Sequence, residues 1–467
     1  MPTGSPKETP KMPLSLARNL TRFVLNSNWI DLPDSVKAAA VRANMNWLAC
    51  ALAGSQTPTF NSALGAAQVL SSRGELSLIG RHETVDASQA VFLNCLSSAA
   101  HAFDDTHLKT ITHPTGPVAA TVWTLAEQLS KEGKFFKGHE LMAALILGME
   151  VECRMSNAIV NHGQGAHIGW YMTGLTGGIG SAAAASKLLG LTENQTVMAL
   201  SLASAQSGGF RATHGSMGTA FVPAMAARNG LAATRLAQQG FNCTEHCLDG
   251  TNGLLAVLSD HCDATLALKG LGQIFEVMDN ALKPYPCGIV IHPAIDTCIA
   301  LHQQGPWAVQ DVESVTLWVH EDTLRLCGRR LTDTVLDTQN SLYHWAAASL
   351  IYPNDVLDNY ELPRVMDPKL RDLQTRIEAN VDSGMQSDQA RAQLRTRQGA
   401  VFNASVEHAS ASAANPMTDE QLNNKFMKLA QRVFSESQAL SLKDMSWHLP
   451  ELIRPLEWFE KSRSPSA

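Results

Sequence analysis

Apolar residues recur at intervals of three and four through most of positions 14–270, which is the period of helices that bury one side. Between Pro33 and Gly54 the stripe consists of Val36, Val41, Met45, Leu48 and Leu52. Pro33 and Asp34 suit the first turn of this helix, and Gly54 suits its end. Small residues dominate 181–206 and 224–239, the latter ended by Gly240, so helix backbones can approach closely. This part of the chain is predicted to be an all-helical body.

The pattern changes after about residue 310. From 312 to 320, Val315, Leu317 and Val319 alternate with polar or aromatic residues, which predicts a half-buried strand. Short extended segments are also expected at 376–381 and 400–408, and a helix at 341–351. Residues 275–408 are therefore predicted to form a smaller α+β domain.

Helix signals return at Thr418, which forms a capping box with Gln421 ahead of an apolar stripe. If this helix packs back on the body, the α+β unit is an insertion that acts as a lid, with a cleft at the junction. The predicted fold is mainly α with an α+β second domain. It comprises a tail (1–13), the first part of the helical domain (14–274), the lid (275–408) and a return segment (409–467).

Composition narrows the class of protein. Of 467 residues, 45% are hydrophobic and 17% charged, as in a globular protein, and the net charge of −7 is spread along the chain. The chain has no basic stripe, so nucleic acid is not expected as a partner. The longest apolar run, 141–149, is too short to span a bilayer of about 30 Å. A small molecule and a second copy of the chain are the expected partners.

The nine cysteines and the N-terminus bear on the compartment. An odd number of cysteines, several in apolar helical stretches, indicates free thiols in a reducing compartment. Cys243, His246 and Cys247 have no second ligand pair at zinc-site spacing, so no metal is predicted. Residues 1–13 lack the apolar core of a secretory signal. A cytoplasmic location is favoured, and a mitochondrial address stays open.

The first segment with candidate chemistry is 100–117. It gathers Asp104, Asp105, Thr106, His107 and His113 ahead of a predicted helix over 118–130. Free backbone N–H groups and the dipole at a helix entrance favour anions, and a carboxylate–imidazole pair can serve as a base and its orienting partner. The alternative is that these residues only cap helices and face solvent.

Three further segments carry polar residues. The glycine-rich stretch 161–180 suits tight helix packing or a pocket wall, because no G-x-G-x-x-G motif occurs there. Segment 210–230 offers ligands for carboxylates, and 281–298 offers a cation and an imidazole at the domain junction, although a lone histidine is more often structural. The side chains singled out are His162, His167, Tyr171 and Thr173, then Arg211, Thr213, His214 and Thr219, and finally Lys283 and His292.

Taken together, these segments resemble signatures of the MmgE/PrpD family, in the same order along nearly the whole chain. The similar motifs are DDTHLKTITHPTGP at 104–117, AARNG at 226–230, KPYPCG…HPAID at 283–296, SLYHWAAA at 341–348 and NPMT at 415–418. The resemblance implies a homodimer, a helical domain with an α+β lid, and no required metal or organic cofactor. It also implies dehydratase, decarboxylase or epimerase activity, with Asp104, Thr106, His113 and His292 matching active-site positions.

Three positions depart from the family pattern. Ala102 stands where members often have an acidic residue, and Tyr171 where many have histidine. Thr219 replaces a lysine of the decarboxylase and the epimerase. Loss of an ammonium from a carboxylate site removes a contact of about 1.5–3 kcal/mol. A substrate with fewer carboxylates, or with an alkyl arm, needs less positive charge, and Lys109, Arg211 or Lys283 could compensate.

The favoured hypothesis is a cofactor-independent lyase that dehydrates a citrate-like acid, such as an alkylcitrate or methylcitrate. His113 or His292 would act as base or acid, and Asp104 or Asp105 would orient an imidazole. Decarboxylation of cis-aconitate is the second hypothesis, and epimerisation or isomerisation of a dicarboxylate the third. A hypothesis from a different functional class is that the protein is a catalytically inactive relative that binds a metabolite. Substrate contacts are expected from Thr106, Lys283, Tyr171, His167, Thr219 and Arg211.

Overall fold

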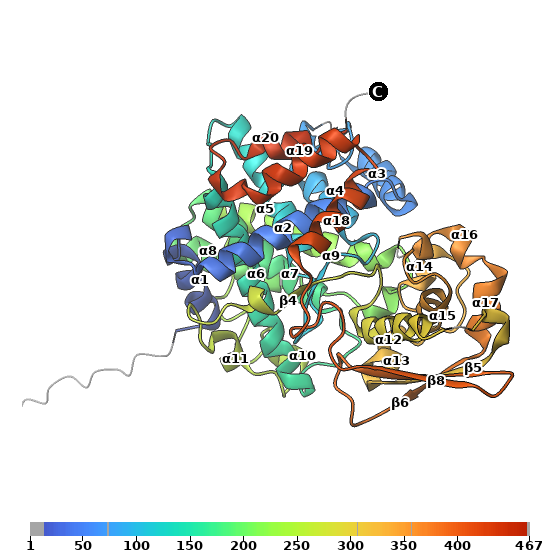
Figure 1. The fold of residues 1–467 in the computed structure, drawn as a ribbon. Coiled ribbons are helices and arrows are strands. Elements are labelled where there is room, and N and C mark those ends of the chain that lie inside the picture. Colours follow the sequence, from blue (N-terminus) through green and yellow to red (C-terminus); the bar gives the residue numbers. More distant parts are fainter. Residues whose placement is uncertain (1–13, 72–73, 306, 356, 465–467) are drawn as a thin grey trace, which may run out of the picture.

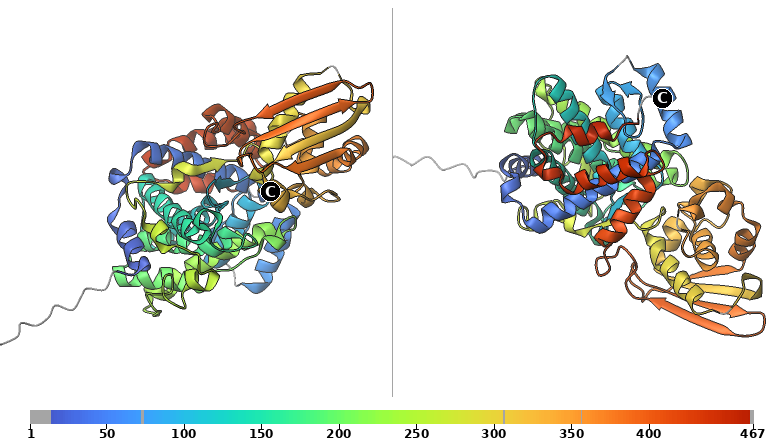
Figure 2. Two further views of the ribbon diagram at one scale, coloured as in Figure 1. Left: turned by 90° about the horizontal axis from the view of Figure 1, so that it is seen from below. Right: turned by 45° about the horizontal axis from the view of Figure 1, so that its top comes forward.

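The computed structural model describes residues 14–71, 74–305, 307–355 and 357–464, and the expected tail at 1–13 lies outside the described residues. A large helical body carries a smaller unit with a sheet on one side (Figures 1 and 2). The predicted class, mainly α with an α+β second domain, is confirmed. Within the described part of the chain, no helix combines the length and the apolarity needed to cross a membrane.

The body is a bundle with α7 at its centre, in contact with α5, α6, α8 and α9. Small residues make this packing possible: a Cβ added to Gly180 would lie 2.7 Å from the carbonyl oxygen of Gly148, and one added to Gly230 would lie 2.4 Å from that of Gly178. The helices are α1 (Leu16–Asn26), α2 (Asp34–Gly54), α3 (Pro58–Leu70), α4 (Ala87–Ala99), α5 (Thr115–Lys131), α6 (Gly138–Val160), α7 (Met172–Leu189), α8 (Glu193–Ser204), α9 (Gly218–Gln238), α10 (Leu254–Leu258) and α11 (Ala264–Leu268).

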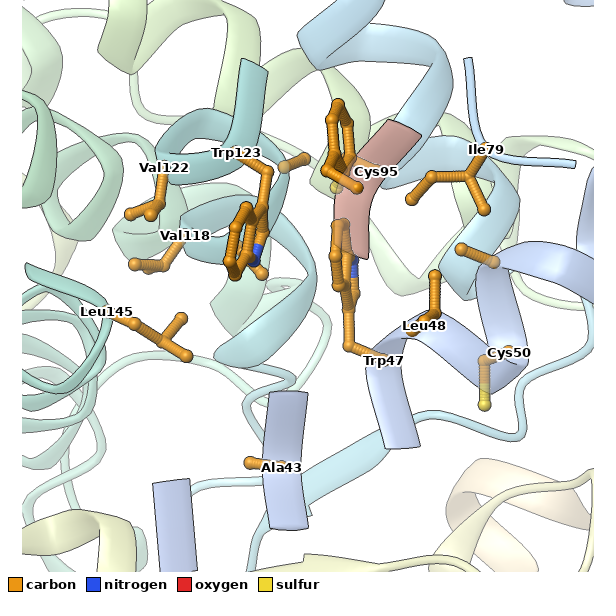
Figure 3. Close-up of a cluster of buried hydrophobic side chains, with 14 of the residues drawn as sticks. Ala43, Trp47, Leu48, Cys50, Ile79, Cys95, Val118, Val122, Trp123 and Leu145 are labelled. Atoms are coloured by element: carbon orange, nitrogen blue, oxygen red, sulfur yellow. The ribbon is translucent and has the colours of Figure 1, made fainter. Parts of the chain in front are cut away.

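The return segment completes the core of the body. Trp47 and Trp123 lie in a cluster of buried side chains from α2, α4, α5 and α6 (Figure 3). Trp123 also packs on Trp458, with 4.5 Å between ring centroids. The capping box of Thr418 and Gln421 starts the first return helix, as predicted, and that helix packs on α2. The return helices are α18 (Asp419–Ala430), α19 (Glu436–Trp447) and α20 (Leu456–Lys461).

The lid has its own hydrophobic core around a four-stranded sheet. The strand order is β6-β5-β7-β8, with β5 and β6 parallel and the other pairs antiparallel. Helices α12 and α15 pack between the sheet and the body (Figure 1). The elements are β5 (Val312–Val319), β6 (Ile377–Val381), β7 (Ala390–Thr396), β8 (Val401–Val406), α12 (His292–Gln303), α13 (Glu321–Cys327), α14 (Val335–Thr338), α15 (Leu342–Ile351), α16 (Leu362–Val365) and α17 (Pro368–Thr375).

The body also contains two short antiparallel strand pairs, so the prediction of an all-helical body is wrong in this detail. The pairs are β1 (Leu76–Ser77) with β2 (Thr84–Val85), and β3 (Asp105–His107) with β4 (Asn280–Leu282). Strands of two or three residues are too short to show an alternating pattern. The β3–β4 pair has a functional consequence, because it joins the first polar segment to the residue that precedes Lys283.

The lid is inserted between two parts of the body. The chain leaves the body after β4 and returns to it at α18, while the lid core extends from Tyr285 to Leu394. The domain limits at 275 and 408 stay a prediction. The chain therefore passes between body and lid twice, once after β4 and once before α18.

Candidate active site

A cavity lies between the body and the lid and holds about 560 Å³ of empty space, part of it open to solvent. The body contributes Ala99, Ala102, Asp104, Ile111, His113, Tyr171, Arg211, His214 and Thr219, the lid contributes Gly288, Ile289, Val290, Leu326, Cys327 and Asn340, and Lys283 stands at the junction.

Asp104 and Lys283 form a buried ion pair on the cavity wall. Pairing of β3 with β4 brings their backbones together, and Lys283 Nζ lies 2.7 Å from Asp104 Oδ1. Lys283 Nζ also donates to the carbonyl oxygen of Ala102 at 3.2 Å. Burial opposes ionisation of Asp104, but His113 and Lys283 outweigh it and hold the pKa of this carboxyl below its usual value. Asp104 is therefore held in its carboxylate form.

His113 has a defined tautomer. Its Nδ1 lies 2.6 Å from the carbonyl oxygen of Asp105 and 3.3 Å from Thr106 Oγ1. A carbonyl oxygen only accepts, so Nδ1 carries the proton and Nε2 has the free lone pair. Burial lowers the pKa of His113 to about 4, against the opposing effect of Asp104, whose Oδ2 lies 3.6 Å from Nδ1. His113 is therefore a neutral imidazole with a carboxylate placed to stabilise its protonated form.

Asp105 and Thr106 lie one layer behind the cavity. Oδ2 of Asp105 accepts hydrogen bonds from Thr115 and from Asn280, the latter at 2.6 Å, while Oδ1 is buried without a partner. Burial and the nearby charge of Asp104 raise the pKa of Asp105 to about 6. Glu152, also fully buried, has a pKa raised well above its usual value by burial and by Asp105. The raised pKa values mean that the carboxyl groups of Asp105 and Glu152 can hold protons directly behind the cavity.

Three rings follow one another along the body side of the cavity. The ring of Tyr171 meets His113 edge to face at 5.9 Å and His214 at 4.7 Å. Burial lowers the pKa of His214 to about 3 and raises that of Tyr171 well above its usual value, so both are neutral. Arg211, on the same loop as His214, has a buried Nη1 without a hydrogen-bond partner. Lys283 is paired with Asp104, whereas Arg211 is a cation of the cavity wall with no ion-pair partner among the described residues.

Two cavity residues have strained backbones. Ala102 has φ of 49° and Ile111 has φ of 55°, in the left-handed region that residues with a Cβ rarely adopt. A β-branched residue such as Ile111 is especially disfavoured there. Such strain concentrates at functional sites, where the surrounding structure holds it in place.

The cavity brings together six of the expected site residues, and four lie elsewhere. Asp105 and Thr106 support His113 from behind. His292 is buried next to Tyr285, with ring centroids 5.2 Å apart, and does not line the cavity. His167 is exposed on its loop. The residues that line the cavity are Asp104, His113, Tyr171, Arg211, Thr219 and Lys283, and the roles of all ten stay predictions.

A second polar cluster lies beside the site. Ligand atoms of His107, Glu276 and Asp279 lie within 4.8 Å of one another, as in a metal site. The ammonium of Lys109 already contacts both carboxylates, at 3.2 Å from Glu276 and 2.6 Å from Asp279. Lys109 therefore neutralises this cluster and is not among the cavity residues, although the sequence had made it a candidate to replace the missing lysine.

Sequence reasoning missed Lys425, which is buried beneath the Asp104–Lys283 pair. A signal was available, because Lys425 falls within the apolar stripe of Leu422, Phe426 and Leu429 on α18. A charged residue at such a position needs buried partners.

These features define a helical protein with an inserted α+β lid and a cavity at the junction that is lined by Arg211 and the Asp104–Lys283 pair. Family models match two parts of the chain, the MmgE/PrpD N-terminal domain at residues 18–267 and the MmgE/PrpD C-terminal domain at 285–451. The chain belongs to the MmgE/PrpD family.

Curated relatives are similar over nearly the full length. The chain is 25% identical over 451 residues to a cis-aconitate decarboxylase of Aspergillus terreus, covering 91% of this chain and 92% of the relative. It is 27% identical to a cis-aconitate decarboxylase-like protein of Aspergillus oryzae (88% and 91% covered) and 24% identical to the cis-aconitate decarboxylase of Mus musculus (88% and 86% covered).

Proposed function

We propose that this protein is a lyase that removes water from a citrate-like acid, with an alkylcitrate or methylcitrate as substrate. The observation that carries the proposal is the cavity, which is lined by a neutral His113, the Asp104–Lys283 pair, apolar side chains and Arg211, whose Nη1 has no hydrogen-bond partner among the described residues. Family membership and the names of the relatives support a lyase acting on an acid of this kind.

In this proposal, cations hold the carboxylates of the substrate. Arg211 offers a planar guanidinium with donors suited to a carboxylate, and Lys283 offers an ammonium held in place by Asp104. Thr219 contributes a hydroxyl on the same wall. The cavity lining thus has two cations, Arg211 and Lys283, and one carboxylate, Asp104.

Proton abstraction is assigned to His113. Its Nε2 takes a proton from the carbon next to a bound carboxylate, and Asp104 stabilises the imidazolium that forms. The departing hydroxyl group leaves as water after it receives a proton, and Tyr171 is a neutral donor on the same wall. The net change is loss of one proton and one hydroxide from adjacent carbons, with formation of a double bond.

Part of the cavity wall suits an alkyl arm. Ile289, Val290 and Leu326 from the lid and Ile111 from the body give the cavity lining apolar side chains beside its ionic groups. Burial of one methylene group contributes about 0.8 kcal/mol. Each carbon added to a side arm should therefore improve binding until the wall is filled.

Decarboxylation of cis-aconitate is the second candidate, and the names of the relatives favour it. Against it stand Thr219, where the family's decarboxylase has a lysine by resemblance, and Tyr171, where many members have a histidine. Both residues line the cavity, so the differences act on the proposed substrate directly.

A substrate panel separates these functions. Purified protein is incubated with citrate, methylcitrate, a longer alkylcitrate and cis-aconitate, while absorbance of the conjugated alkene and released carbon dioxide are followed. Dehydration gives rising alkene from the alkylcitrates without gas, and gas from cis-aconitate would instead establish decarboxylation. Absence of turnover together with thermal stabilisation by one of these acids would assign the protein to the binding class.

We also propose that the protein is a homodimer, as the family resemblance implies. Phe210, Met217 and Phe221 are exposed large apolar side chains on the loop and helix beside the cavity, and they are the candidate contact residues. Sedimentation equilibrium tests this, and a mass of one chain at micromolar concentration would contradict it.

A further inference from the structure

We propose that Lys425 is a positioning residue of the active site, which holds the chain segments of Asp104 and Lys283 at a fixed separation. The inference rests on the proposed assignment of the cavity as the active site. It concerns a residue outside the cavity, on a helix that follows the whole lid in sequence.

Lys425 Nζ joins the two segments directly. It donates to the carbonyl oxygen of Phe103 at 2.6 Å and to that of Lys283 at 2.7 Å. Phe103 precedes Asp104 in the chain, and Lys283 is the partner of Asp104. One ammonium group therefore holds the backbone on both sides of the ion pair, across sequence separations of 322 and 142 residues.

The surroundings of Lys425 leave it little freedom. The ammonium lies 3.7 Å from the centre of the Phe103 ring, and the residue is 7% exposed. The thiol of Cys50 donates to the same Phe103 carbonyl at 3.1 Å. A buried ammonium satisfied by two carbonyls and an aromatic face cannot be replaced by water or by a neutral side chain without reorganisation.

The place of Lys425 in the topology links it to the lid. The chain passes from body to lid at Lys283 and returns to the body at α18, which carries Lys425. The contact between Lys425 and the Lys283 carbonyl therefore ties the outgoing segment to the returning helix. A movement of the lid that displaces Lys283 from α18 would break or stretch it.

A role in stability alone would make Lys425 an anchor for α18, comparable to the half-buried Lys187, which also binds carbonyl groups. Lys187 provides the comparison, because its Nζ donates to the carbonyl oxygens of Leu25 and Ser27 at 2.9 and 2.7 Å, remote from the cavity. The positioning role predicts effects on turnover that removal of Lys187 does not produce. Burial lowers the pKa of Lys425 to about 8, which adds a pH signature.

The test compares full-length Lys425→Met with Lys187→Met, using the best substrate of the panel. Thermal stability, kcat, KM and the pH dependence of kcat are measured below the unfolding temperature of each variant. Both variants should lose thermal stability. K425M should also lose at least tenfold in kcat, whereas K187M should stay within twofold of wild type.

The pH profile is the second readout. Wild type and K187M should lose activity as pH rises through about 8, because Lys425 then loses its charge, and this basic limb should be absent from K425M. A K425M variant with kcat within twofold of K187M, or with the limb intact, would overturn the positioning role. Absence of turnover in wild type bears on the proposed function instead. In that case, binding of methylcitrate by calorimetry replaces kcat, and equal affinities of the two variants would overturn the inference.

Discussion

Lys283 and Asp104 are 179 residues apart in sequence, and their side chains meet at 2.7 Å on the wall of the cavity. The contact depends on the short β3–β4 pair, whose register sets Asp105 opposite Leu282. Because the two charges satisfy each other, the cavity gains a fixed polar wall but little net charge from them. Recognition of an anion then depends most on Arg211, whose buried Nη1 has no hydrogen-bond partner among the described residues.

Replacement of Arg211 by methionine should raise KM more than it lowers kcat. A charge-assisted contact with a carboxylate contributes about 1.5–3 kcal/mol, which corresponds to roughly a 10- to 150-fold rise in KM. Steady-state kinetics with methylcitrate measure this. Arg395→Met, an exposed arginine on β7, is the matched control, and a similar KM for both variants would remove Arg211 from the binding site.

His113→Gln should reduce kcat by at least 100-fold, because general base catalysis by a positioned side chain contributes about 10²–10⁴-fold. Glutamine keeps a group able to donate to the Asp105 carbonyl but has no basic nitrogen. His344→Gln, a change to a buried lid histidine that binds the Asn359 carbonyl, serves as a control for folding. Equal turnover by wild type and H113Q would rule out His113 as the base.

His113 should also determine how kcat/KM falls at acid pH. His113 accepts a proton only when it is neutral, and its pKa is lowered to about 4, so the neutral form predominates above that pH. Log kcat/KM should therefore be flat from pH 7 down to about 5 and fall below it. A limb centred near 6.5, the ordinary value for histidine, would show that the base is a different group or is far more exposed to water.

Asp105→Asn should stabilise the protein above pH 6. The carboxyl of Asp105 has a pKa raised to about 6 in the folded state, against about 3.9 when unfolded. Its contribution to stability is present below pH 4 and is lost as pH rises through 6, because ionisation is then favoured only in the unfolded chain. The asparagine variant has no carboxyl group at this position and does not lose this stability. Its free energy of unfolding should therefore exceed that of wild type by about 3 kcal/mol at pH 8.

Urea unfolding of wild type and D105N at pH 5 and pH 8 provides the measurement. The gap between the two proteins should widen with pH. A constant gap would show that Asp105 is ionised in the folded state at both pH values, and that Thr115 and Asn280 stabilise its charged form more than burial opposes it.

Thr219→Lys should shift preference toward substrates with more carboxylates. Thr219 lines the cavity, so an ammonium at this position would add a third cation to a wall that now has Arg211 and Lys283. The ratio of kcat/KM for citrate, which has three carboxylates, over malate, which has two, should rise at least tenfold. Thr219→Met, similar in length but uncharged, separates charge from size, and equal ratios for the two variants would contradict the charge argument.

Local sequence patterns predicted much of this fold because helix ends and strand alternation are determined by residues close together in the chain. The stop at Gly54, the capping box at Thr418 and the alternation from 312 to 319 each depend on neighbours within a few residues. The sequence pattern does not predict strand β7. Its exposed positions include Arg391 and Arg395, and its buried positions include two alanines, so the apolar alternation is weak. Its identity as a strand depends on pairing with β5 and β8, which local sequence does not record.

The site was predictable in part for the same reason. Asp104 and His113 lie close in sequence, and the polar character of their segment was visible. The convergence with Lys283 depends on a three-residue strand pair, and the support from Lys425 depends on the path of the chain through the lid. His292 shows the reverse case: it precedes Pro293 at a helix start as expected, but its ring packs beside Tyr285 and not on the cavity.

The return of the chain to the body has a consequence for biosynthesis. Trp458 and Phe459 fill the body core beside Trp123, yet the ribosome makes them only after the entire lid. A nascent chain that ends near residue 410 thus holds every strand of the lid sheet and an unfinished bundle with Trp123 uncovered on one side. The core of the bundle therefore stays incomplete until α20 has been made, and apolar surface exposed around Trp123 at that stage is prone to aggregation.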